Sequence, residues 1–354
     1  MASSTGEVLL PAGDLSETID YFADELGFRM VLISPADDPS EAVLEGLGIT
    51  VRLVPDLSGS TALRLPSDQN RPSVVAPNGT EVRFFVPSDE LDLGPLERSF
   101  VVSRSADGHF GAGRAGMGYR DLIPNRQGGR FIASHIHIPD GGPVPDYVHH
   151  HHILFQMIFC YRGWADLVYE DQGPPFRMNA GDCVLQPPHI RHRVLATSAD
   201  FDVVEIGCPA RHDTLRDHEL ALPNETIAPD RDFGGQRFVW HRASAAMWKP
   251  WRQPGFESQD FGFAEATGSV ATASVVRAAG ADRIEAFEHQ RDLHFWFVMQ
   301  GGLVLSRNGK ERHRLGPADS VTLPAGEVFE VAEVSADLEL LEVLLPGAEA
   351  AQPS

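Results

Sequence analysis

Short apolar runs separated by turn residues fill most of the chain from Arg130 onward. Such runs, bounded by many of the chain's 26 prolines and 33 glycines, are typical of strands and too short for ordinary helices. Closely spaced short strands predict a small β-sandwich or barrel over residues 130–210. The runs expected to form it are Phe131–Ile138, Ile153–Tyr161, Ala165–Glu170, Asp182–Gln186 and Val203–Ile206.

A second set of runs repeats this architecture over residues 256–346. Its expected strands are Phe295–Met299, Leu303–Arg307, Ser320–Leu323 and Leu338–Leu344. A chain of 354 residues also exceeds what one core usually organises, so two or three packed domains are expected. Residues 87–129 and 211–255, where polar residues interrupt short apolar pieces, are predicted to be linkers. The predicted fold class is therefore mainly β, with two barrels.

The first 86 residues follow a different pattern. We expect strands at Val8–Pro11, Phe28–Ser34, Glu41–Glu45 and Ile49–Leu53. Between the first two, apolar residues at helical spacing predict a helix that opens at Asp14 or Ser16 and is capped by Gly27. The resulting β-α-β-β-β order predicts a small α+β module over residues 1–86.

Composition excludes several partners. The formal net charge of −21 and the pI near 5.0 leave no basic stripe for nucleic acid or an anionic membrane surface. No apolar run approaches the ~20 residues of a membrane span, and no signal peptide is evident, so we expect a cytoplasmic protein. Three widely spaced cysteines predict reduced core residues, not a disulfide framework.

Two histidine-bearing stretches carry the chemistry. One holds four consecutive histidines, His149 to His152, and the other ends at His192. Side chains on a strand alternate faces, so histidines two apart point the same way, with Cα atoms roughly 6.5 to 7 Å apart. A third imidazole from a neighbouring strand would complete a set that suits Fe, Zn, Cu or Ni. This reasoning leaves two pairs open, His149 with His151 and His150 with His152.

The two stretches together resemble the cupin superfamily. Gln156 lies seven residues before Gly163, and His192 lies five after Pro187, as the cupin motifs require. The resemblance implies metal ligands at His149, His151 and His192, because similar bacterial bicupins usually carry Tyr at the middle position and no His at the fourth. It also places Gln156, as a ligand or catalytic residue, where most metal cupins have Glu.

The resemblance implies an enzyme. Three neutral histidines without a carboxylate resemble the sites of cupins such as the cysteine and β-diketone dioxygenases, so the activity that the resemblance favours is that of a non-heme Fe(II) dioxygenase. Its expected partners are O2 and a small chelating substrate such as an enediol, a diketone or a phenolic acid. Zn, Mn, Ni or Cu are the alternative metals, in an isomerase, lyase or hydrolase. A barrel that binds a small molecule without turnover is the third alternative.

The other two modules offer poorer sites. In the second barrel, His289 and His294 lie where ligands are expected, but Arg291 and Phe329 occupy the remaining positions, so we expect a degenerate barrel. The N-terminal module resembles half of a glyoxalase/bleomycin-resistance (vicinal oxygen chelate) domain. Arg83 stands where that family has a ligand Glu, and we expect the module to serve packing or dimerisation, with a homodimer as the expected assembly.

Overall fold

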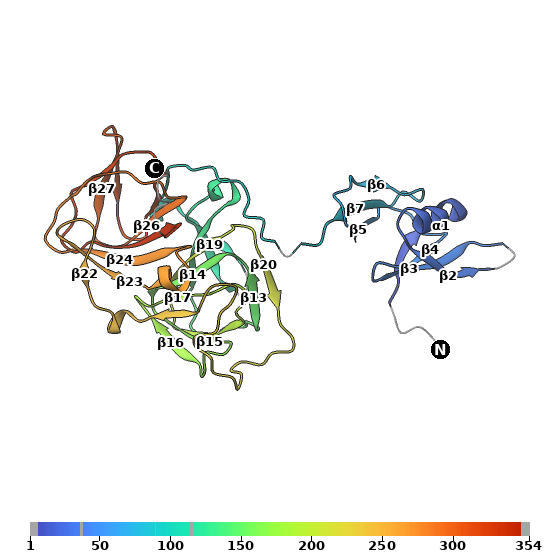
Figure 1. The fold of residues 1–354 in the computed structure, drawn as a ribbon, viewed down its shortest axis with the longest axis horizontal. Helices are drawn as coiled ribbons and strands as arrows, with labels where there is room; N and C mark the ends of the chain where they lie inside the picture. Colours follow the sequence, from blue (N-terminus) through green and yellow to red (C-terminus); the bar gives the residue numbers. More distant parts are fainter. Residues whose placement is uncertain (1–5, 36–37, 89, 114–115, 348–354) are drawn as a thin grey trace. The chain divides into compact units, whose positions relative to one another are not determined.

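A computed structural model describes residues 6–35, 38–88, 90–113 and 116–347 (Figure 1). The chain divides into two compact units, with the boundary between Glu90 and Leu91. Within the described ranges, no helix has both the length and the apolar character needed to cross a membrane.

The first unit begins with the predicted β-α-β-β-β order and continues with three further strands. Asp14 caps the helix by accepting a hydrogen bond from the Glu17 N–H at 3.0 Å, as expected, but the helix ends earlier than expected, with Glu25 as its C-cap. The four-stranded sheet has the order β1-β4-β3-β2, and a three-stranded sheet follows with the order β5-β7-β6. The elements are β1 (Val8–Pro11), α1 (Leu15–Asp24), β2 (Arg29–Ser34), β3 (Glu41–Gly46), β4 (Ile49–Val54), β5 (Ala62–Pro66), β6 (Val74–Val75) and β7 (Glu81–Phe85).

The second unit consists of two β halves. The first half, green to yellow in Figure 1, contains a seven-stranded sheet with the order β21-β17-β14-β19-β11-β10-β9. Its strands are β9 (Gly111–Ala112), β10 (Gly118–Asp121), β11 (Ile132–Ile138), β14 (Phe155–Arg162), β17 (Cys183–Leu185), β19 (Phe201–Cys208) and β21 (Val239–His241).

A six-stranded sheet completes the first half. Its main order is β16-β15-β18-β13-β20, with β12 paired to β18. Apolar side chains from both sheets, such as Val203 and Leu167, pack into one buried cluster, so the half is a β-sandwich. The strands of this sheet are β12 (Gly142–Pro143), β13 (His149–His152), β15 (Trp164–Tyr169), β16 (Phe176–Asn179), β18 (His192–Thr197) and β20 (Asp213–Arg216).

The second half, orange to red in Figure 1 apart from β8, repeats the arrangement with sheets of seven and four strands. The larger has the order β22-β23-β24-β31-β26-β29-β8 and the smaller β25-β30-β27-β28. The strands are β8 (Val101–Ser103), β22 (Lys249–Pro250), β23 (Phe256–Asp260), β24 (Thr272–Ala278), β25 (Ile284–Phe287), β26 (Leu293–Gln300), β27 (Leu303–Arg307), β28 (Glu311–Leu315), β29 (Ser320–Thr322), β30 (Phe329–Ala332) and β31 (Glu339–Leu345). Short helical segments are η1 (Ser105–Asp107), η3 (Arg126–Gly129), η4 (Ala243–Ala245) and α2 (Phe263–Ala266).

The two seven-stranded sheets pack against each other through a shared core. Strand β14 turns Phe155, Met157 and Phe159 toward this core, which also contains Phe295 and Phe297 of β26. Side chains alternate along a strand, so the residues between them face the interior of the first half. Gln156 is one of these inward residues.

The segments 87–129 and 211–255 differ from the predicted linkers. The first supplies β8 to the second half and β9 and β10 to the first half, while the second supplies β20, β21 and β22. Each of these strands has only two to four residues. Strands this short carry almost no periodic signal, because pairing with their neighbours stabilises them more than their own sequence does.

Candidate metal centre

The histidine run itself forms strand β13, and its alternation separates the four rings. His149 and His151 point inward and are buried, with 1% and 9% of their surfaces exposed. His150 and His152 are half-buried, and their rings lie beside His189, at centroid distances of 5.6 and 5.2 Å. Of the two pairs that the sequence left open, the structure turns the pair His149 and His151 toward His192.

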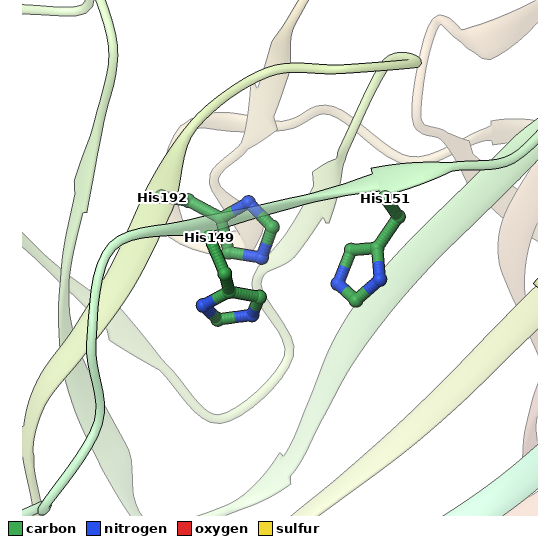
Figure 2. Close-up of side chains that lie close together, drawn as sticks. All are labelled: His149, His151 and His192. Atoms are coloured by element: carbon green, nitrogen blue, oxygen red, sulfur yellow. The ribbon is translucent and has the colours of Figure 1, made fainter. Parts of the chain in front are cut away.

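Strand β18 brings the third imidazole to this pair. His192 stands directly opposite His149 in the β13–β18 register. The ring centroids lie 4.3 Å apart for His149 and His192, 5.2 Å for His149 and His151, and 5.3 Å for His151 and His192. Each ring offers one nitrogen, and these nitrogens lie within 4.8 Å of one another (Figure 2). Across the described ranges, no other group of three His, Cys, Asp or Glu residues is gathered this closely.

Hydrogen bonds at Nδ1 set the tautomers of these rings. The Nδ1–H groups of His149 and His192 donate to the carbonyls of Tyr147 and Ile190, at 2.8 and 3.0 Å. Backbone carbonyls only accept, so each ring carries its proton on Nδ1 and its lone pair on Nε2. His151 Nδ1 lies 3.0 Å from the Thr214 hydroxyl, which can accept in the same way. This is the outer hydrogen bonding that metal-ligating histidines usually have.

Gln156 lies on β14 and lines the same cavity, with 2% of its surface exposed. Its Nε2 donates to Glu205 Oε1 at 2.6 Å. Its Oε1 is buried and has no hydrogen-bond partner among the described residues. A buried acceptor without a partner is costly, so this oxygen suits an ion or a hydrogen-bond donor that would complete the site. The three imidazole nitrogens therefore fit a divalent metal ion, and the Gln156 amide offers an oxygen in the same cavity.

The cavity around these groups has a volume of about 430 Å³, within the usual range for small-molecule sites. Its polar lining includes the histidines, Gln156 and Glu205, together with Asp121, Arg126, Ser134, Gln186 and Thr214. Most of the remaining wall is apolar and includes Met117, Ile136, Leu167, Met178, Phe201 and Val203. Such a cavity can hold a ligand that has a small polar head and an apolar body.

Sequence reasoning missed several residues of this site. Glu205 was within an expected strand, where alternation with Val203 places it on the inward face, so a charged residue there was a usable signal. Thr214 and His212 lie in a segment that we predicted to be a linker. His212 lines the cavity with its ring centroid 5.3 Å from that of His151, and no motif marked it.

The corresponding region of the second half is built differently. His294 Nε2 lies 2.9 Å from Glu342, and Arg252 donates two hydrogen bonds of 2.6 Å to the same carboxylate. These two bonds and His294 hold the pKa of Glu342 well below its ordinary value, despite the opposing effect of burial. Phe329 is fully buried in the apolar core. An arginine thus supplies positive charge next to this buried carboxylate.

Comparisons with known proteins bear on the fold. No protein-family model matches this sequence, and no curated protein matches it either. Among solved structures, the oxalate decarboxylase of Lactobacillus farciminis matches with a TM-score of 0.53 at 13% identity, over 73% of this chain and 89% of that one. The Bacillus subtilis oxalate decarboxylase with Mn(II) centres has a TM-score of 0.50, 12% identity, and coverage of 73% and 81%. The YlbA protein of E. coli has a TM-score of 0.50, 12% identity, and coverage of 73% and 96%.

These likenesses establish the fold class. The chain is mostly β and has the fold of cupin-type proteins, as the motifs predicted. At identities of 12 to 13%, these likenesses do not assign an activity to this chain. The glyoxalase-like character of residues 1–86 stays a prediction.

Proposed function

We propose that this protein is a metal-dependent cupin enzyme whose ion is held by His149, His151, His192 and Gln156. The convergence of one imidazole nitrogen from each of His149, His151 and His192 in a single cavity is the observation that carries this proposal. The presence of Mn(II) centres in a B. subtilis protein of the same fold is consistent with a divalent ion.

The activity that we favour is that of a non-heme Fe(II) dioxygenase. Bound there, Fe(II) would coordinate a chelating substrate and supply electrons to O2. The three histidines are neutral donors, so the ion keeps its positive charge and favours an anionic chelating head, such as a deprotonated enediol, diketone or phenol. The apolar walls exclude water and pack against the body of the substrate.

A second candidate is a redox-inert lyase, isomerase or hydrolase that uses Mn(II) or Zn(II). Glu205 favours it, because a carboxylate in the cavity offers a place for a proton during bond cleavage. The oxalate decarboxylases of the same fold are lyases by name, which also makes this class worth testing.

Metal exchange separates the two candidates. The metal-free protein would be loaded anaerobically with Fe(II), Mn(II) or Zn(II) and tested with a panel of enediols, diketones, phenolic acids and dicarboxylates. A dioxygenase consumes O2 only in the Fe(II) form, and His192→Ala abolishes that uptake. Turnover without O2 in the Mn(II) or Zn(II) form would favour the second candidate. A fully Fe(II)-loaded protein that consumes no O2 with any chelating substrate contradicts the first.

A further inference from the structure

The hydrogen bond between Gln156 and Glu205 joins two neighbouring strands on the cavity side. In the β14–β19 register, Gln156 stands opposite Gly207, and Glu205 stands opposite Ile158. The two side chains are therefore diagonal neighbours on one face of the sheet. Gln156 Nε2 donates to Glu205 Oε1 at 2.6 Å, and both residues line the cavity that holds the three imidazoles.

This contact fixes which way the amide points. An ionised carboxylate has only acceptors, so the amide must present its NH2 group to Glu205. The amide oxygen is then directed elsewhere, and it is buried without a hydrogen-bond partner among the residues described. If the amide turned over, two acceptors would face each other at hydrogen-bond distance, which is repulsive. Glu205 thus keeps one orientation of Gln156.

We infer that Glu205 is a positioning residue that makes Gln156 an oxygen donor to the metal centre. The inference rests on the proposed metal site. In the cupin motif, the position of Gln156 is normally a Glu, which supplies a carboxylate. Here a neutral amide occupies that position, and the carboxylate belongs to Glu205 on the neighbouring strand β19, outside the group of three histidines. The negative charge therefore stays near the ion without occupying a coordination position.

Exchanging the two side chains tests this arrangement. In Glu205→Gln, residue 205 can donate to Gln156 Oε1, so the amide can turn its NH2 toward the histidines. We expect the affinity for Co(II) or Mn(II) to fall by about 10- to 100-fold, the usual cost of losing an outer partner of a ligand. In the double variant Gln156→Glu/Glu205→Gln, the hydrogen bond re-forms with its polarity reversed. The affinity should then return at least to that of the unaltered protein.

Metal affinity would be measured by competition with a chelating dye, and the Co(II) absorption spectrum would report the ligand set. Glu265→Gln removes one negative charge from a mostly exposed side chain and should change neither readout. Thermal melting would establish that each variant is folded. The spectrum should change in Glu205→Gln and change again in the double variant, where a carboxylate becomes the ligand.

The outcomes separate the inference from the proposed function. An unaltered protein that binds neither Co(II) nor Mn(II) overturns both. An unaltered protein that binds them, with a Glu205→Gln variant of equal affinity and identical spectrum, overturns only the role of Glu205. A double variant that stays as weak as Glu205→Gln also counts against it, because the reversed hydrogen bond should restore the oxygen donor.

Discussion

His149 and His192 form a cross-strand pair between β13 and β18, with ring centroids 4.3 Å apart. The proposed metal site depends on this pair, because it joins the two histidine-bearing stretches. Replacing either residue by alanine leaves two imidazoles, and we expect the metal affinity to fall by more than about 100-fold, beyond the cost of losing an outer partner.

His150→Ala is the matched control for this prediction. His150 lies on the same strand but on the opposite face, beside His189, so the variant should keep the affinity of the unaltered protein. The metal content after dialysis and the affinity from chelator competition would be measured for the ligand variants and for this control. Equal retention of metal by His149→Ala, His192→Ala and His150→Ala would contradict the assignment.

A second prediction concerns acid stability. Burial lowers the pKa of His289 to about 4, with the neighbouring His294 adding to the shift. In the unfolded chain this pKa is about 6.5. Between these values the unfolded chain binds a proton that the folded chain does not, so the free energy of unfolding rises with pH. The contribution of His289 is fully present above pH 6.5 and is lost as the pH falls toward 4.

His289→Asn should remove this contribution. The slope of the free energy of unfolding between pH 4.5 and 6 should drop by up to about 1.4 kcal/mol per pH unit. Urea unfolding at several pH values measures the slope. His218→Asn, which replaces an exposed histidine, is the matched control for the substitution itself. An unaltered slope in His289→Asn would show that His289 titrates alike in both states.

A third prediction concerns the core between the two β halves. Phe159 is fully buried and stacks on Phe261, with centroids 6.0 Å apart and planes 9° apart. Phe159→Ala should lower the free energy of unfolding by about 3 to 5 kcal/mol, through lost burial and the cavity that remains. Met247→Ala, at a side chain that is 75% exposed, should change it by less than about 0.5 kcal/mol. Denaturant unfolding measures both, and a loss below 1 kcal/mol for Phe159→Ala would contradict the packing.

The cysteines give a fourth prediction. All three are free and buried, as the sequence predicted. Burial raises the pKa of Cys208 to about 12, and it also raises the pKa values of Cys160 and Cys183. Thiolates are therefore scarce at pH 8. The folded protein should not react with a thiol reagent in the time that the denatured chain takes to have all three cysteines labelled. Rapid labelling of the folded protein would contradict this burial.

Strands that coincide with a run of apolar residues were predictable from the sequence. Val8–Pro11 and Leu303–Arg307 have the bounds that were expected. The run His149–His152 forms a strand of its own, although polar imidazoles give no apolar pattern, because its backbone pairs with β18 and β20. A run of apolar residues thus predicts the strands that side-chain preference stabilises. It does not predict the strands that depend on backbone pairing with their neighbours.

Some features of the candidate site were likewise predictable from the sequence, and others were not. The spacing of His149, His151 and His192 was readable, since alternation along a strand and the cupin motifs both depend on local sequence. The contact between Gln156 and Glu205 was not, because the two residues are 49 positions apart and meet only through the β14–β19 register. That register is a property of the folded sheet.

The alternation along β14 has a consequence for any attempt to shorten the protein. The second half covers Phe155, Met157 and Phe159 on one face of the strand. From the other face, Gln156 projects into the cavity. A chain cut before residue 256 would expose these rings to water along one face, and that face would drive self-association. The second half thus covers an apolar face of the first, and its removal would lower the solubility of the protein even if the cavity and its histidines stayed intact.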